Sequence, residues 1–282
     1  MAIRSYLYAP GNRPDLLAKV LGKGADAVIL DLEDAVPPAE KAKARGIVSD
    51  FLAVSATEAT LLVRLNGGAD ALADLAALTV RGLHGVLLPK AEDPELIRAV
   101  DRLLGAREAA AGVTPGSIIV QPLIESVAGL YGLDALAAAS PRIRRFAFGA
   151  GDFVRDLRAE PTAARLETLY ARQHLVARSR FLGLEAPVAH VFMPVNDLAA
   201  LRHACEEDRA LGFYGRSCIH PAQVPIVTDV FQPGAEALAQ AEKILAAYAD
   251  AMREGRGALV LDDGTFVDEA IAARARDVLA RA

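Results

Sequence analysis

Charged side chains follow several apolar runs of this chain of 282 residues. A charge in such a run is costly unless it is paired or bound to a metal, so these positions point to a site. The run VILDLEDAV contains Asp31 and ends in Glu33 and Asp34, which would either cap the next helix or line that site. The run LLVRLN contains Arg64, whose planar guanidinium would pair with a neighbouring acid or bind a substrate carboxylate or carbonyl.

Glu125 in PLIES and Asp152 in GAGDF are the best candidates for metal ligands. Two carboxylates without a cluster of His or Cys suit a hard ion such as Mg²⁺, which keeps several of its waters. Either residue alone would be explained equally well as a helix cap or as a member of an ion pair. The two together favour a metal site.

Lys90, in GVLLPK, introduces an alternative chemistry, because a desolvated lysine forms a Schiff base in class I aldolases. A charge pair at the rim of the fold explains Lys90 more simply. His220, in RSCIHPAQV, would act as a general base or as a structural hydrogen-bond partner before Pro221, and alone it favours the structural role. Four other histidines lack the spacing of metal ligands and are interpreted as surface or core residues: His84, His174, His190 and His203.

The elements that must position these residues are short apolar runs, typical of strands, which alternate with Ala- and Leu-rich stretches at helical spacing. Helices are expected, for example, over Pro14–Leu21, Ala39–Phe51 and Pro94–Leu104. The expected strands lie in SYLYAP, DAVILDLED, TLLVRLN, GVLLPK, IIVQPLIES, RRFAFGAGD, APVAHVFM and GFYGRSCIHP. Eight such units predict an α/β protein with a (β/α)8 TIM barrel, whose active site lies at the carboxyl ends of the strands. A doubly wound sheet is the alternative, but no G-x-G-x-x-G follows the first strand.

The last fifty residues are additional to a barrel. A helix is expected over Ala235–Glu254, a hairpin around Asp263-Gly264, and a final helix over Glu269–Arg281. The predicted domains are therefore a catalytic barrel, 1–232, and a C-terminal extension, 233–282. A simple hairpin turn would explain the tail, and packing over the active site of a neighbouring subunit would give it a function.

The composition limits the function classes. The formal net charge is −5 and no basic block is present, so nucleic acid is excluded as a partner. No run approaches the ~18 apolar residues of a membrane span, and no signal-peptide pattern opens the chain. Cys205 and Cys218 have no pairing signature, which is typical of a reducing compartment. A cytoplasmic protein without membrane contact is expected.

Seven motifs occur in an order that resembles citrate lyase β-subunits and their relatives in the HpcH/HpaI aldolase group, which include malyl-CoA and citramalyl-CoA lyases. They are RSYLYAPGN, DAVILDLEDAV, LLVRLN, GVLLPKAE, PLIES, AFGAGDF and GRSCIHPAQV. The resemblance extends from Arg4 to about Phe231. It implies a Mg²⁺-dependent, homo-oligomeric enzyme, trimer or hexamer, that breaks or makes a C–C bond. The partners of that bond would be a 2-keto acid (oxaloacetate, glyoxylate or pyruvate) and an acyl thioester.

The resemblance also implies roles for single residues. Glu125 and Asp152 are similar to the metal ligands, and Glu125 would also contact the substrate. Arg64 matches a substrate-binding arginine that stabilises the enolate, and Tyr8 matches a residue at the thioester's entry. In the relatives an aspartate from a neighbouring subunit's tail completes the site, and the motif GTFVDEA makes Asp268 the candidate.

The carrier of the acyl group stays open between coenzyme A and an acyl-carrier protein. Arg13, Lys19 and His220 are assigned to carrier binding, but Asp15 stands where some relatives have lysine. For Glu33 and Asp34 we expect a supporting role beside Arg64 and the metal's waters, or a share in proton transfer.

Three other functions are compatible with the same motifs. One is a metal-dependent aldolase of free hydroxy-keto acids, and another is a malyl-thioester hydrolase. The third is a non-catalytic or carrier-dependent subunit of a multi-component citrate lyase. The intact carboxylates and arginine argue against a scaffold without activity.

Overall fold

The computed structural model describes residues 3–281. The chain divides after Thr228 into two compact units, a larger one over Ile3–Thr228 and a C-terminal one from Asp229. The domain boundary expected from sequence lies four residues later, after position 232. All the site residues expected from sequence, except Asp268, belong to the larger unit.

The larger unit is built on a parallel sheet of seven strands, in the order β6-β5-β4-β3-β2-β1-β7. The strands are nearly continuous apolar runs, as expected when helices cover a parallel sheet. Their bounds are β1 Ser5–Pro10, β2 Ala27–Asp31, β3 Thr60–Arg64, β4 Gly85–Leu88, β5 Ile119–Ile124, β6 Ala147–Phe148 and β7 Arg216–Cys218. The order follows the chain without the reversal of a doubly wound sheet, which removes that alternative.

The segment expected as the remaining strand, in APVAHVFM, forms only isolated parallel bridges, Ala147 to Val188 and Ala189 to Arg216. The prediction of a closed (β/α)8 barrel is therefore confirmed only in its coarser part, as a curled, barrel-like sheet of seven strands. The segment does not form a strand because it pairs with each of its neighbours, β6 and β7, at a single position. Phe148 N donates to Val188 O, and Ser217 N donates to Ala189 O, both at 3.0 Å.

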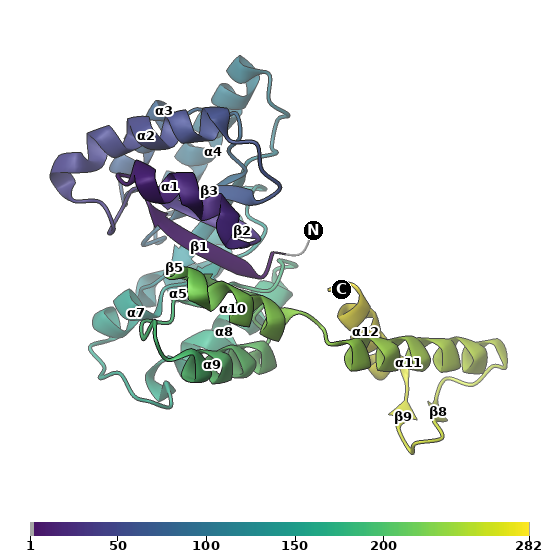
Figure 1. Cartoon of the computed structure of the whole chain (residues 1–282). Helices are drawn as coiled ribbons and strands as arrows, with labels where there is room; N and C mark the ends of the chain where they lie inside the picture. Colours follow the sequence, from purple (N-terminus) through teal and green to yellow (C-terminus); the bar gives the residue numbers. More distant parts are fainter. Residues whose placement is uncertain (1–2, 282) are drawn as a thin grey trace. The chain divides into compact units, whose positions relative to one another are not determined.

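The helices of the larger unit follow the strands along the chain, and α2, α3 and α4 lie side by side outside the sheet (Figure 1). Proline occupies a first-turn position in α1 and α4, where a missing N–H costs nothing. The bounds are α1 Pro14–Val20, α2 Lys41–Val54, α3 Asp70–Ala77, α4 Pro94–Ala111, α5 Val127–Tyr131, α6 Leu133–Ala137, α7 Ala150–Leu157, α8 Leu166–Phe181 and α9 Leu198–Leu211. The helix α10, Val224–Phe231, begins in the larger unit and ends in the C-terminal one. Three short 3₁₀ turns are η1 Leu21–Lys23, η2 Pro38–Glu40 and η3 Pro221–Gln223.

A core of alternating strand residues fills the inside of the curled sheet. It comprises Tyr6, Ala27, Ile29, Leu62, Leu87, Leu123, Ala147 and Val188, all nearly inaccessible to solvent. Since side chains alternate between the two faces of a strand, the positions two residues further along point to the same interior. Val188 contributes to this core although its segment forms no full strand.

The C-terminal unit contains α11 (Ala235–Arg253), a hairpin of β8 (Leu259–Val260) and β9 (Phe266–Val267), and α12 (Glu269–Leu279). Tyr248, Leu261 and Val267 form its small core with neighbouring apolar side chains. Gly264 takes a left-handed conformation (φ 84°) in the hairpin turn, as the Asp-Gly pair predicts. No helix within residues 3–281 is both long and apolar enough to cross a membrane.

Candidate functional site

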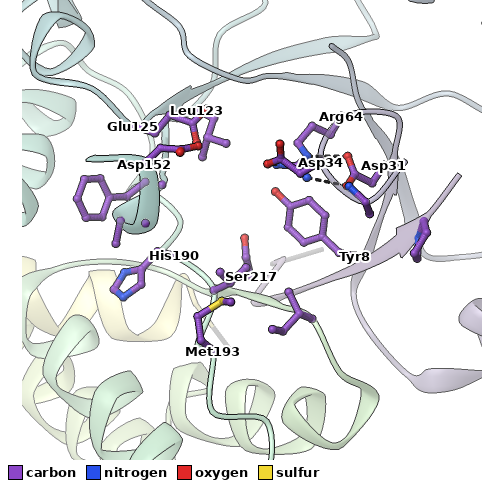
Figure 2. Close-up of a pocket in the computed structure, with 18 residues that line it drawn as sticks. Tyr8, Asp31, Asp34, Arg64, Leu123, Glu125, Asp152, His190, Met193 and Ser217 are labelled. Carbon is purple, nitrogen blue, oxygen red and sulfur yellow. Dashed lines mark hydrogen bonds and ion pairs between the residues drawn. The ribbon is translucent and has the colours of Figure 1, made fainter. Parts of the chain in front are cut away.

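A cavity of about 510 Å³ opens at the carboxyl ends of the strands. The inward positions that follow the core residues line it: Tyr8 after Tyr6, Asp31 after Ile29, Arg64 after Leu62, Glu125 after Leu123 and His190 after Val188. Figure 2 shows Glu125 and Asp152 on one side and Arg64, Asp31 and Asp34 on the other. The geometry therefore brings together five residues expected from sequence: Tyr8, Asp34, Arg64, Glu125 and Asp152.

Arg64 is held by carboxylates on two neighbouring segments. Asp31 and Arg64 are register partners at the ends of β2 and β3, and Arg64 Nε and Nη2 donate to the two Asp31 oxygens, each at 2.6 Å. Nη1 lies 2.9 Å from Glu33 Oε2 and 3.2 Å from Asp34 Oδ2. Burial lowers the pKa of Arg64, but the hydrogen bonds and charge of Asp31 raise it more, so the net shift is upward. The guanidinium stays charged and fixed, over the ring of Tyr8.

Asp31 was not assigned a role from sequence, although it is the most buried acid of this group, with 1% of its side chain exposed. Its two oxygens also accept the backbone N–H groups of Glu33 (2.9 Å) and Ala35 (3.1 Å). Asp31 therefore shapes the loop after β2 as well as orienting Arg64. The acids of the motif DLED do not cap the next helix, since neither η2 nor α2 has a side-chain cap in the described chain. Asp31 and Asp34 line the cavity, which agrees with the other interpretation of these charges.

Glu125 is anchored by the backbone of Lys90, whose N–H donates to Glu125 Oε1 at 2.7 Å. Lys90 adopts a left-handed conformation (φ 48°), which is uncommon for a residue other than glycine and marks a constrained position. Burial raises the pKa of Glu125 to about 7, against the hydrogen bond from Lys90 and with support from the charges of Glu33 and Asp152. A Cβ on Gly149 would lie 2.5 Å from Glu125 Oε2, so only glycine leaves room for this carboxylate.

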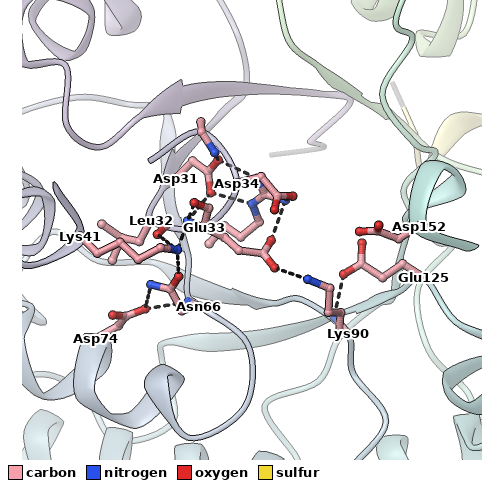
Figure 3. Close-up of polar contacts among 12 residues, drawn as sticks. Asp31, Leu32, Glu33, Asp34, Lys41, Asn66, Asp74, Lys90, Glu125 and Asp152 are labelled. Atoms are coloured by element: carbon pink, nitrogen blue, oxygen red, sulfur yellow. Dashed lines mark hydrogen bonds and ion pairs between the residues drawn. The ribbon is translucent and has the colours of Figure 1, made fainter. Parts of the chain in front are cut away.

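Asp152 was expected at the end of a strand, but it lies in the first turn of α7. Figure 3 shows its carboxylate beside that of Glu125. Arg155, whose side chain is exposed, pairs with Asp152 at 2.9 Å. Burial is the main cause of the raised pKa of Glu125, and the charges of Glu33 and Asp152 add to it. A hard cation fits two such carboxylates at one end of a cavity, because its charge would offset both effects. Within residues 3–281 no three His, Cys, Asp or Glu side chains form a metal cage. The fit is therefore to an ion that keeps waters or binds substrate oxygens.

Lys90 pairs with Glu33 Oε1 through its Nζ at 3.0 Å. This hydrogen bond raises the pKa of Lys90, and the ammonium is half exposed. A Schiff-base lysine needs a lowered pKa, so the structure favours the charge pair for Lys90. Its partner is Glu33 from the loop after β2.

His190 was interpreted from sequence as a surface or core residue, but its ring lines the cavity. It stands edge-on to Phe148, with centroids 5.9 Å apart, and its Nδ1 is buried without a hydrogen-bond partner. Burial, and then the nearby guanidinium of Arg216, lower its pKa to about 3, so the imidazole is neutral. The period-two alternation from Val188 is the sequence signal that could have identified it.

The residues expected to bind the carrier do not line this cavity. Arg13 pairs with Asp15 on the exposed start of α1, and Lys19 is exposed on the same helix. His220 accepts the backbone N–H of Ala222 at 3.2 Å and caps η3, which is the structural role weighed from sequence.

Asp268 caps α12 in the C-terminal unit, and its side chain accepts from Ile271 N at 3.0 Å. Both cysteines are buried and unpaired with each other.

The model of the HpcH/HpaI aldolase/citrate lyase family matches residues 4–221. The chain belongs to this family. The match spans β1 to the start of η3 and therefore includes every side chain of the cavity described above.

Members of the HpcH/HpaI family resemble this chain over nearly its whole length. It is 36% identical to the citrate lyase subunit beta-like protein of Deinococcus radiodurans, over 98% of this chain and 96% of that protein. It is 33% identical to an L-malyl-CoA/beta-methylmalyl-CoA lyase of Cereibacter sphaeroides, over 99% and 94%. Its structure resembles CitE from Mycobacterium tuberculosis in complex with magnesium, acetoacetate and coenzyme A, with a TM-score of 0.79, 30% identity, and 99% and 98% coverage.

Proposed function

We propose that this protein is a Mg²⁺-dependent carbon–carbon lyase that cleaves, or in reverse forms, a 3-hydroxyacyl thioester. The products would be a 2-keto acid and an acetyl-type thioester. The observation that carries the proposal is that Glu125 and Asp152 face the clamped Arg64 across one cavity. The related lyase of Cereibacter sphaeroides and the CitE complex with magnesium and coenzyme A support this reaction class.

Glu125 and Asp152 would hold the ion, whose chemistry is to polarise the oxygens of the keto acid or the hydroxyl from which it forms. The substrate carboxylate would lie at the start of α7, where Ala150 and Gly151 line the cavity. This helix begins without a side-chain cap in the described chain, so its first N–H groups and its dipole favour an anion.

Arg64 would stabilise the negative charge that develops on the thioester oxygen. In cleavage the hydroxyl loses its proton, the bond between the carbinol carbon and the thioester's α-carbon breaks, and the carbinol becomes a ketone. The electron pair forms the thioester enolate, which takes up a proton at the α-carbon. Because Asp31, Glu33 and Asp34 hold the guanidinium in place, no reorganisation is needed as the charge appears.

The proton would be moved by Asp268 from the tail of a neighbouring subunit, with Glu33 and Asp34 as supports for Arg64. This makes the working unit a homo-oligomer, for which a trimer or hexamer in the cytoplasm is our expectation. Within each subunit, segment 187–190 would take the place of the eighth barrel strand, a role supported by its two bridges. We infer coenzyme A as the carrier, held in part by Arg13 and Lys19 on the exposed face of α1.

Condensation assays with the purified full chain test the function. With Mg²⁺, acetyl-CoA and a 2-keto acid, we expect a 3-hydroxyacyl-CoA product detected by mass spectrometry, and we expect EDTA to abolish it. Arg64→Ala should be inactive while folded. Full turnover without metal would contradict the proposal. Borohydride trapping of a keto acid on Lys90 would instead establish the Schiff-base alternative.

A further inference from the structure

The side chains that line the cavity carry little positive charge. Among the lining residues of the described chain, the carboxylates are Asp31, Asp34, Glu125 and Asp152, and Arg64 is the one Lys or Arg. Arg64 is already paired with Asp31, Glu33 and Asp34. Besides the ion held by Glu125 and Asp152, one anionic group can be received at the start of α7. Among these lining residues a second substrate carboxylate would meet no uncommitted cation.

Apart from Glu125 and Asp152, the wall opposite β2 and β3 is uncharged. It is formed by Phe148 and the segment His190, Val191 and Met193, with Ile219 beside them. Figure 2 shows His190, Ser217 and Met193 along this side, with Glu125 and Asp152 nearer to Leu123. A ligand held between the carboxylate pair and Arg64 would direct its remaining substituent at this wall. Burying a charged substituent there without a partner is strongly unfavourable.

His190 is the titratable group of this wall, and it is neutral; Ser217 adds a hydroxyl, which also carries no charge. The titratable groups around it are Arg216, Asp208, Arg165 and Arg172, and burial together with Arg216 keeps its pKa near 3. The arginines are committed to Asp208, which pairs with all three, and Arg216 also donates to the backbone oxygen of His190 at 2.8 Å. The imidazole therefore brings no charge to this wall, and its Nδ1 is buried without a hydrogen-bond partner.

We propose that the substrate is a monocarboxylic 2-keto acid, whose hydrogen or small alkyl substituent packs on Phe148, His190 and Met193, and that dicarboxylic keto acids are discriminated against. His190 acts as the specificity-determining residue because its uncharged ring occupies the place where a second carboxylate would need a cation. This inference rests on the proposed lyase function and narrows it to malyl- and citramalyl-type thioesters.

The test compares glyoxylate, pyruvate and oxaloacetate on the full chain with Mg²⁺ and acetyl-CoA. The better of glyoxylate and pyruvate should exceed oxaloacetate in kcat/KM by on the order of 100-fold. Equal or better use of oxaloacetate overturns the inference. If no keto acid is condensed, the lyase function fails, and calorimetric binding of the three acids to the Mg²⁺-loaded protein still decides the inference. Binding of oxaloacetate as tight as that of pyruvate then overturns it.

Two variants test the role of His190. His190→Arg places a cation on the wall and should shift the preference toward oxaloacetate by about tenfold. The matched neutral variant, His190→Gln, should keep the wild-type preference. Where His190→Arg does not fold, Met193→Arg adds the cation at the mouth, because Met193 is 70% exposed. An unchanged ratio of the two keto acids in a folded arginine variant overturns the assignment.

Discussion

Asp31 and Arg64 are register partners on adjacent strands, and Arg64 donates two hydrogen bonds of 2.6 Å to the carboxylate of Asp31, which is almost completely buried. This bidentate pair fixes both the plane and the direction of the guanidinium. An arginine held in this way can stabilise a developing charge without losing rotamer freedom at the moment of reaction.

Asp31→Asn should therefore reduce activity although Arg64 itself is intact. The amide would turn a donor toward the guanidinium and break one arm of the pair, at a cost of about 2 kcal/mol of unfolding free energy. A misplaced guanidinium should lower kcat/KM by about 100-fold. Steady-state kinetics and urea unfolding measure the two effects.

Asp34→Asn is the matched control for that variant. Asp34 contacts the same guanidinium, but at 3.2 Å and with 64% of its side chain exposed. An exposed pair contributes little, so its unfolding free energy should change by less than about 1 kcal/mol. Equal losses in both variants would contradict the special role of the buried pair.

Gly149→Ala should weaken magnesium binding. The new Cβ would lie 2.5 Å from Oε2 and 2.6 Å from Cβ of Glu125, which is tied to the backbone of Lys90 and cannot move freely. Displacing a ligand through its surroundings lowers metal affinity by about tenfold or more. Gly46→Ala in α2 is the control, because its Cβ meets nothing within 4 Å. Calorimetric titration with Mg²⁺ separates the two, and equal affinities would refute the steric argument.

Glu125→Gln and Asp152→Asn should each remove measurable magnesium binding at millimolar ion. Each variant keeps the shape of its side chain and deletes half of the paired negative charge. Thermal shift with and without Mg²⁺ gives the readout: the wild type should be stabilised by the ion and the variants should not. Stabilisation of both variants to the wild-type extent would place the ion elsewhere.

Stability should fall with acid because of His190. Its pKa is about 3 in the folded protein against 6.5 for an ordinary histidine, so between these values the unfolded chain binds the proton and the folded chain does not. The unfolding free energy therefore increases as the pH rises from about 3 to 6.5, and it decreases as the pH falls through the same range. From pH 7 to pH 5 the loss attributable to His190 is about 2 kcal/mol. Urea unfolding of His190→Gln should lack this component, and parallel pH curves would contradict it.

Two inactive variants should restore activity when combined. If Asp268 serves the cavity of a neighbouring subunit, mixed oligomers of Arg64→Ala and Asp268→Asn contain sites with both residues intact. Asparagine caps a helix as well as aspartate does, so Asp268→Asn should leave α12 stable. Activity in co-expressed protein, with none in either variant alone, is the expected result. Absence of complementation would argue that each chain completes its own site.

The sequence indicated the family, the strand order and the acids at strand ends because these depend on local pattern. The N1 prolines located the first residues of α1 and α4, although α4 continues to Ala111, beyond the expected end at Leu104. The segment around Val188 reads as a strand by composition, but whether it pairs fully depends on the curvature of its neighbours. The roles of Asp31 and His190 depend on which face of a strand points inward, and alternation counted from Val188 would have revealed His190.

The strands that carry the cavity wall differ in how extensively they pair with their neighbours. The side with Asp31 and Arg64 rests on strands of five residues, whereas β6 has two residues and segment 187–190 is joined only by bridges. The loosely joined side carries Phe148, His190 and Met193. Gly149 and Asp152 closely follow β6, so this side carries both the wall that would contact the substituent and one of the two acids that would hold the ion. A substitution that loosens it should therefore change substrate choice and ion binding together.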